Sequence, residues 1–244
     1  MALVAQNGFD DLLAAVKRVP HWRVIIRPEV FEEGRIPSLA DCQQIVESSK
    51  VSLGGMGYPR LYHHEKLSRG NDWVGYRFQL PGVLEVWRFY QSGQFVQRFS
   101  LRESEMDDVA VERERNRVYT PEDFTPMGFM DWMLTLYTVT QVFEFAARLA
   151  EKGVFDDALR ITIEMIGVKD RVLCLLGGVL QMDRFYAAGE DRLAGEWACG
   201  TEDILANSAA LARVATAHFF ERFGWDVSPD WLANQQKKFF GHTT

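Results

Sequence analysis

The feature that most constrains the fold is an aromatic segment, residues 72–101, whose apolar side chains fall on both faces of a predicted β-meander. It carries eight aromatic side chains in thirty residues: Trp73, Tyr76, Phe78, Trp87, Phe89, Tyr90, Phe95 and Phe99. An antiparallel sheet with one solvated face alternates apolar with polar residues. That alternation fails here, so either the protein's own helices cover both faces or one face meets a ligand or a partner.

The pairing of the last two strands follows from the turn that joins them. Ser92-Gly93 predicts a two-residue turn, because glycine readily adopts the positive φ that such a turn requires. In that register Trp87 lies opposite Arg98, and Phe89 lies opposite Val96. One face of the meander then brings Trp87, Phe89 and Arg98 together.

Trp87, Phe89 and Arg98 are therefore the first candidate binding site. Aromatic rings beside an arginine can stack planar groups and pair with anions, as in single-strand nucleic-acid modules and peptide grooves. The alternative is that a helix of the same chain packs on this face, with Arg98 lying across Trp87 as a cation-π pair.

His63 and His64, with Asp72 nearby, form the second candidate. Imidazole titrates near neutrality, so these residues are candidates for acid-base chemistry or metal binding. Neighbouring residues of an extended segment point to opposite sides, which favours a solvated loop instead. The glycine-rich segment 54–57 lacks the Lys-Ser/Thr of a P-loop and matches no nucleotide-binding fingerprint. No metal site and no cofactor is predicted.

The remaining pattern predicts an α+β protein. Ser38 is a predicted N-cap of a helix through Ser49, and Thr120-Pro121 predicts another helix start. A buried central helix is expected at about residues 128–152, and a second hairpin at residues 158–176. The fold class is an antiparallel aromatic meander plus this hairpin, packed on the central helix and on C-terminal helices.

Residues 102–117 form a mixed-charge stretch with little apolar content, typical of a solvated loop or an exposed helix. We expect a single α+β domain over residues 1–244. The alternative is two subdomains, 1–101 and 118–244, that this charged connector joins.

The composition narrows the classes of partner. The 27 basic and 34 acidic residues give a formal charge of −7 and a pI near 5.3. This field disfavours nucleic acid without excluding a local basic patch, and it disfavours anionic membranes. Cys42, Cys174 and Cys199 are odd in number and lack C-x-x-C spacing, which predicts reduced thiols rather than a disulfide framework or a zinc site.

No membrane span or secretory signal is predicted. Charged residues interrupt the longest apolar run, residues 127–150, and residues 1–10 lack a basic segment followed by an apolar one. We therefore expect a cytoplasmic protein.

Three segments resemble a family of bacterial proteins for which no activity is known to us. They are residues 35–39 (Arg-Ile-Pro-Ser-Leu), the segment from Val51 that ends in Tyr58-Pro59, and residues 90–95 (Tyr-Gln-Ser-Gly-Gln-Phe). Where the family pattern has a basic residue, a tryptophan and an acid before Tyr-Pro, this chain has Gly54, Met56 and Gly57. The resemblance implies a bacterial, intracellular origin and supplies no activity.

The sequence thus favours a non-enzymatic binding or assembly module that contacts a protein partner or a second copy of itself through the Trp87 face. A nucleic-acid-associated module using the same face is the alternative. A hydrolytic enzyme using His63, His64 and Asp72 comes third.

Overall fold

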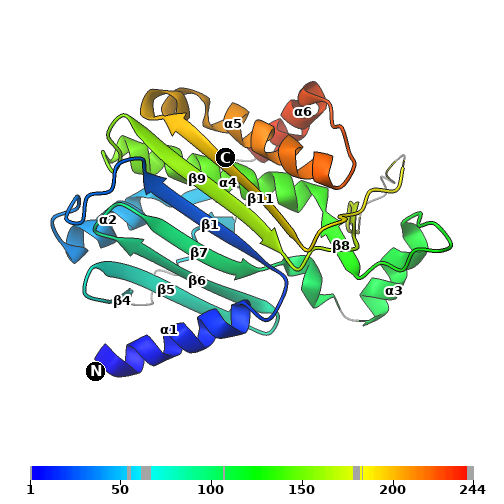
Figure 1. Ribbon diagram of the computed structural model, residues 1–244, viewed down its shortest axis with the longest axis horizontal. Helices are drawn as coiled ribbons and strands as arrows, with labels where there is room; N and C mark the ends of the chain where they lie inside the picture. Colours follow the sequence, from blue (N-terminus) through cyan, green and yellow to red (C-terminus); the bar gives the residue numbers. More distant parts are fainter. Residues whose placement is uncertain are drawn as a thin grey trace.

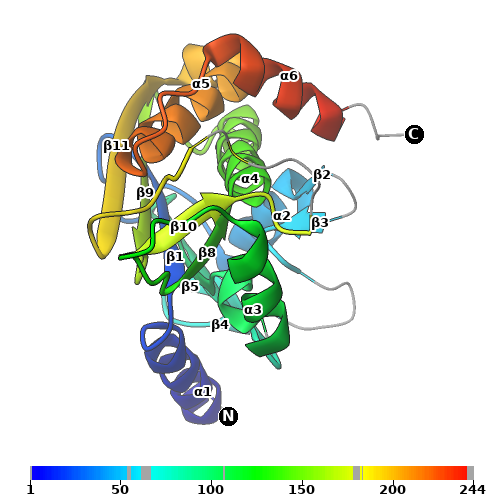
Figure 2. The same cartoon turned by 90° about the vertical axis from the view of Figure 1, so that its right-hand side faces the viewer.

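A seven-stranded antiparallel sheet dominates the fold, and a long helix, α4, packs across one of its faces (Figures 1 and 2). The computed structural model describes residues 2–53, 56–61, 67–106, 108–177, 182 and 184–240. The helices are α1 (Ala2–Val16), α2 (Leu39–Ser49), η1 (Arg102–Glu105), α3 (Asp108–Arg117), α4 (Trp132–Glu151), α5 (Thr201–Arg222) and α6 (Pro229–Phe240). The strands are β1 (His21–Pro28), β2 (Val51–Leu53), β3 (Met56–Tyr58), β4 (Ser68–Arg69), β5 (Trp73–Leu80), β6 (Val83–Tyr90), β7 (Phe95–Ser100), β8 (Gly128–Asp131), β9 (Ala158–Ile166), β10 (Arg171–Cys174) and β11 (Arg192–Gly200). The predicted α+β class is confirmed.

The strand order of the main sheet is β11-β9-β1-β7-β6-β5-β4. Strand β1 pairs with β7 on one side and with β9 on the other. The sheet therefore joins strands from both sides of residues 102–117. That stretch forms η1 and α3, and two of its acidic side chains, Glu103 and Glu114, are buried rather than solvated.

Two predicted elements end up with different partners or bounds. Strands β9 and β10 form within the predicted hairpin, but β9 pairs with β1 and β11, whereas β10 pairs in parallel with β8. Because residues 128–131 form β8, the central helix starts at Trp132, after the N-cap Asp131. The predicted helix start at Thr120-Pro121 is wrong: only a turn forms there, with the Phe124 amide donating to the Pro121 carbonyl at 3.0 Å.

The predicted register of the meander is wrong by one residue. The β6–β7 loop has three residues, since the Tyr90 amide donates to the Gln94 carbonyl at 2.9 Å. Gly93 takes φ +80°, as the last residue of such a loop does when it forms a bulge. Trp87 therefore pairs with Gln97, and Phe89 pairs with Phe95. A shift by one residue moves every side chain of a strand to the other face.

Both faces of the meander are covered by the protein's own helices. On the inner face, Trp87 packs against Phe95, whose ring contacts Phe145 of α4 with centroids 4.9 Å apart. On the outer face, Phe9 of α1 packs edge-on against Trp73, 5.1 Å between centroids. This double cover explains why the apolar pattern fails to alternate. Within the described residues, no helix is both long and apolar enough to cross a membrane.

Replacing Trp87 with alanine is expected to lower the free energy of unfolding by about 3–5 kcal/mol, because the side chain is 1% exposed and its removal leaves a cavity. Chemical denaturation measures the change. Phe31→Ala is the matched control, since Phe31 is 76% exposed and its loss should cost about 0.5 kcal/mol or less. Similar losses for the two variants would contradict the burial of Trp87.

Candidate functional site

The structure separates the three residues of the first predicted site. Trp87 and Phe89 point to the inner face and are fully buried, whereas Arg98 lies on the outer face. The indole N–H of Trp87 donates to the backbone carbonyl of Arg60 at 3.0 Å. Trp87 is therefore a core residue that also holds the loop carrying Arg60.

The second predicted site is not assembled by the described residues. His63 and His64 lie outside the described part of the chain. Asp72 is exposed in the turn before β5, where its backbone carbonyl accepts from the Gln91 amide at 2.7 Å. Among the described residues, no cluster of three or more histidine, cysteine, aspartate or glutamate side chains could hold a metal ion.

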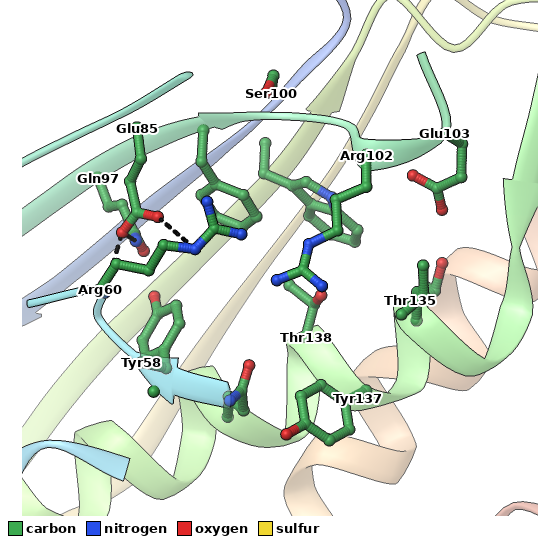
Figure 3. A pocket seen from close by; sticks show the side chains of 15 residues that line it. Tyr58, Arg60, Glu85, Gln97, Ser100, Arg102, Glu103, Thr135, Tyr137 and Thr138 are labelled. Carbon is green, nitrogen blue, oxygen red and sulfur yellow. Dashed lines mark hydrogen bonds and ion pairs between the residues drawn. The ribbon is translucent and has the colours of Figure 1, made fainter. Parts of the chain in front are cut away.

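A polar cavity lies between the inner face of the sheet and α4 (Figure 3). The space in it that a water-sized sphere can occupy is about 40 Å³, within a wider hollow of about 560 Å³ that includes open solvent. Its polar lining comes from the end of β3 and the following loop, from β6, β7 and η1, and from α4: Tyr58, Arg60, Glu85, Gln97, Ser100, Arg102, Glu103, Thr135, Tyr137, Thr138 and Gln141.

Glu85 is the buried anchor of the sheet wall. Its carboxylate accepts from Gln97 Nε2 at 2.8 Å and from the Arg60 amide at 3.1 Å. The Arg60 Nε lies 3.4 Å from the second carboxylate oxygen. Burial raises the pKa of Glu85 despite the nearby charge of Arg60.

Arg60 is held in place before any ligand arrives. Its guanidinium is paired with Glu85 and lies over the ring of Phe78, 5.4 Å from the centroid. The Trp87 indole fixes its backbone carbonyl. A charged group with so many fixed contacts loses little conformational freedom when it binds a ligand.

Arg102 brings a second guanidinium to the same cavity. It extends from η1 toward Thr138 and Tyr137 on α4 (Figure 3). Partial burial, followed by the positive charge of Arg60, lowers the pKa of Arg102. Thr138 and Gln141 are three residues apart on α4, so both reach this wall from one face of the helix.

The hydroxyl of Tyr58 and the side-chain carbonyl oxygen of Gln97 are buried in the walls with no hydrogen-bond partner among the described residues. The Tyr58 ring packs on Phe145, 5.6 Å between centroids, and burial holds the pKa of its hydroxyl well above the ordinary value. A buried group of this kind costs about 1–3 kcal/mol unless something satisfies it.

Glu103 links the cavity to the start of α4. Its carboxylate accepts from the Asp131 amide at 3.0 Å, while the Asp131 side chain caps α4 by accepting from the Met133 and Leu134 amides. Burial raises the pKa of Glu103 as well. The cavity thus combines two cations with two buried carboxyls whose charged forms are disfavoured.

Sequence reasoning did not find this cavity. Glu85 and Gln97 are polar residues among the aromatic positions of the meander, and with the observed register both point inward. These two polar residues among aromatic positions are the signal in the sequence that points to a polar cavity on this face. Nothing in the spacing of Arg60 or Arg102 indicates that the fold brings them to the same wall.

In comparisons with protein-family models, with curated proteins and with solved structures, nothing matches this chain. The family resemblance noted in the sequence stays a prediction. Function is therefore argued from the geometry alone.

The Glu85 carboxyl is expected to titrate at higher pH than an ordinary glutamate, and the Glu196 carboxyl at lower pH. Burial raises the first pKa, while the hydrogen bond from Arg160 lowers the second. Carbon-13 NMR of the side-chain carboxyls measures both, and Glu85→Gln and Glu196→Gln assign the signals.

The sign of the stability effect follows from the Glu85 shift. The native state holds this proton more tightly than the unfolded chain does, so the group favours folding below the unfolded pKa. That contribution is lost as the pH rises through the folded pKa. A pKa of Glu85 below that of Glu196 would contradict its burial in the cavity wall.

Proposed function

We propose that this chain is a small-molecule binding protein, and that the cavity between the sheet and α4 takes a ligand carrying an oxyanion, a carboxylate or a phosphate. The observation that carries this proposal is the pair of guanidiniums, Arg60 and Arg102, on the walls of one partly buried space. Guanidinium groups match the geometry of carboxylate and phosphate oxygens.

Electrostatics favours an anion at this position. Partial burial, and after it the like charge of Arg60, lower the pKa of Arg102. Glu85 and Glu103 lie on the same walls, and burial raises the pKa of both carboxyls. A bound oxyanion would relieve the repulsion between the two arginines.

The other lining groups suit the polar remainder of a small ligand. The Tyr58 hydroxyl can donate and the Gln97 carbonyl oxygen can accept, and both lack a partner among the described residues.

The protein-contact module expected from the sequence stays a prediction. It would need a surface other than Trp87, because α4 covers that side chain. Self-association, a cytoplasmic location and a bacterial origin also stay predictions. The nucleic-acid alternative loses its aromatic platform for the same reason, since Trp87 and Phe89 are buried.

Arg102→Gln is expected to weaken binding of a small anion about tenfold or more, because it removes one of two charge-assisted contacts. Amide NMR titrations of the full chain with inorganic phosphate, succinate, citrate and free amino acids measure the affinities. Arg102 is chosen because Arg60 pairs with the buried Glu85, so its loss would also destabilise the fold.

Arg115→Gln is the matched control, because Arg115 lies on α3 and pairs with Glu112, three residues before it. Its affinities should equal those of the unaltered chain, and both variants should melt near the same temperature. The proposal fails if no anion of the panel shifts the amides around the cavity at millimolar concentration. It also fails if the two variants bind equally well.

A further inference from the structure

A second hollow lies on the opposite face of the same strands, between the C-terminal half of α1 and strands β1, β6 and β7. We call it the outer groove. The space above its floor, including the part open to solvent, is about 600 Å³. Its described lining is Leu13, Lys17, Arg23, Val86, Trp87, Arg88, Tyr90, Val96, Gln97 and Arg98. Trp87 and Gln97 point to the inner face, so the side chains of their neighbours in the strands form the floor.

The outer groove concentrates positive charge in an acidic protein. Four of its described lining residues are basic and none is acidic, although the whole chain carries a formal charge of −7. Arg23 pairs with Glu164 at 3.1 Å, and Arg88 pairs with Asp10 at 3.3 Å. In the described part of the chain, Lys17 and Arg98 have no acidic partner within ion-pair distance.

Arg98 is positioned by a buried histidine. The His21 side chain is 2% exposed, and its Nδ1 lies 2.8 Å from the Val19 carbonyl. A carbonyl only accepts, so Nδ1 carries the proton, which leaves Nε2 to accept from Arg98 Nη1 at 2.8 Å. His21 is therefore neutral, and burial accordingly lowers its pKa.

The contact with His21 fixes the Arg98 guanidinium without neutralising it. Partial burial and then the charge of Arg23 lower the pKa of Arg98, and the charge of Glu164 offsets this only in part. Arg88 on the other side is also held, with its guanidinium 4.5 Å from the ring centroid of Trp73. The outer groove thus presents ordered cations that lack a full set of counter-charges.

We propose that the outer groove binds a small phosphorylated organic molecule, with phosphoryl oxygens at Arg98 and Lys17 and the organic portion against Leu13, Val86 and Tyr90. A phosphate carries up to two negative charges and three acceptor oxygens, which suits several cations better than a single carboxylate does. The apolar and aromatic floor beside the cations provides contact area for the organic portion.

The charges around the outer groove restrict the ligand to a short one. Strand β9 beyond Arg23 carries Glu164, and Arg160 on the same face lies between Glu29 and Glu196 at 2.6 Å from each. Glu164 also pairs with Arg192, so Arg23, Arg160 and Arg192 are already engaged in ion pairs. Nucleic acid needs a basic surface that follows many phosphates, whereas Lys17 and Arg98, the groove cations without an acidic partner in the described part of the chain, suit about one or two.

Binding by the full chain is measured with inorganic phosphate, pyrophosphate and adenosine monophosphate, using amide NMR and calorimetry. The nucleotide is expected to bind tighter than inorganic phosphate, because only it reaches the apolar floor. Arg98→Gln should weaken nucleotide binding about tenfold or more, as the loss of a charge-assisted contact does. Lys17→Gln should weaken it in the same direction, and because Lys17 is exposed this variant tests the site even if Arg98→Gln fails to fold.

Arg160→Gln is the matched control: it removes an equal charge from the same sheet face, outside the outer groove, and should leave the affinity unchanged. Equal losses for Arg98→Gln and Arg160→Gln would reveal general charge attraction and overturn the proposal. So would unchanged affinity in Lys17→Gln and Arg98→Gln, or no binding at millimolar concentration. A single-stranded oligonucleotide that binds tighter than the mononucleotide would overturn it in favour of nucleic acid.

Arg102→Gln separates this proposal from that for the inner cavity. Loss of nucleotide binding in Arg102→Gln, with full binding in Arg98→Gln, would place the nucleotide in the cavity and remove the case for the outer groove.

Discussion

The three-residue loop between β6 and β7 is the constraint on which both candidate sites depend. The hydrogen bond from the Tyr90 amide to the Gln94 carbonyl, with Gly93 at positive φ, sets Trp87 opposite Gln97. Glu85 and Gln97 then point toward α4, while Arg98 points outward. A two-residue turn would exchange the faces of β7, placing Arg98 in the core and separating Gln97 from Glu85. The chemistry of each face is therefore decided by one residue in a turn.

The sheet wall of the inner cavity is organised by its polar groups. Glu85, Arg60 and Gln97 are bound to one another by hydrogen bonds and an ion pair. Breaking a buried ion pair costs more than the pair contributes to stability. The buried ion pair between Glu85 and Arg60 holds the Arg60 guanidinium in place in the sheet wall.

Local signals predicted the elements better than their partners. The Ser38 cap forms as expected, with its hydroxyl accepting from the Asp41 amide, because a cap depends on a few neighbouring residues. At Thr120-Pro121 an equally good local signal yields only a turn, and the next regular element is β8, which pairs with β10 more than forty residues later. The cavity was unpredictable for the same reason: Arg60, Glu85 and Arg102 meet only when a loop, a strand and η1 pack on α4.

Gln97 and Arg98 are neighbours in one strand, yet they belong to opposite faces with different chemistry. The inner face lines a small space with paired charges, whereas the outer groove presents cations to solvent. Between them lies an antiparallel ladder in which β7 is bonded to β6 and β1. Coupling between two sites requires an element with two states that both ligands bias. The ladder separates the two candidate sites in space, and Gln97 is a residue that lines both hollows.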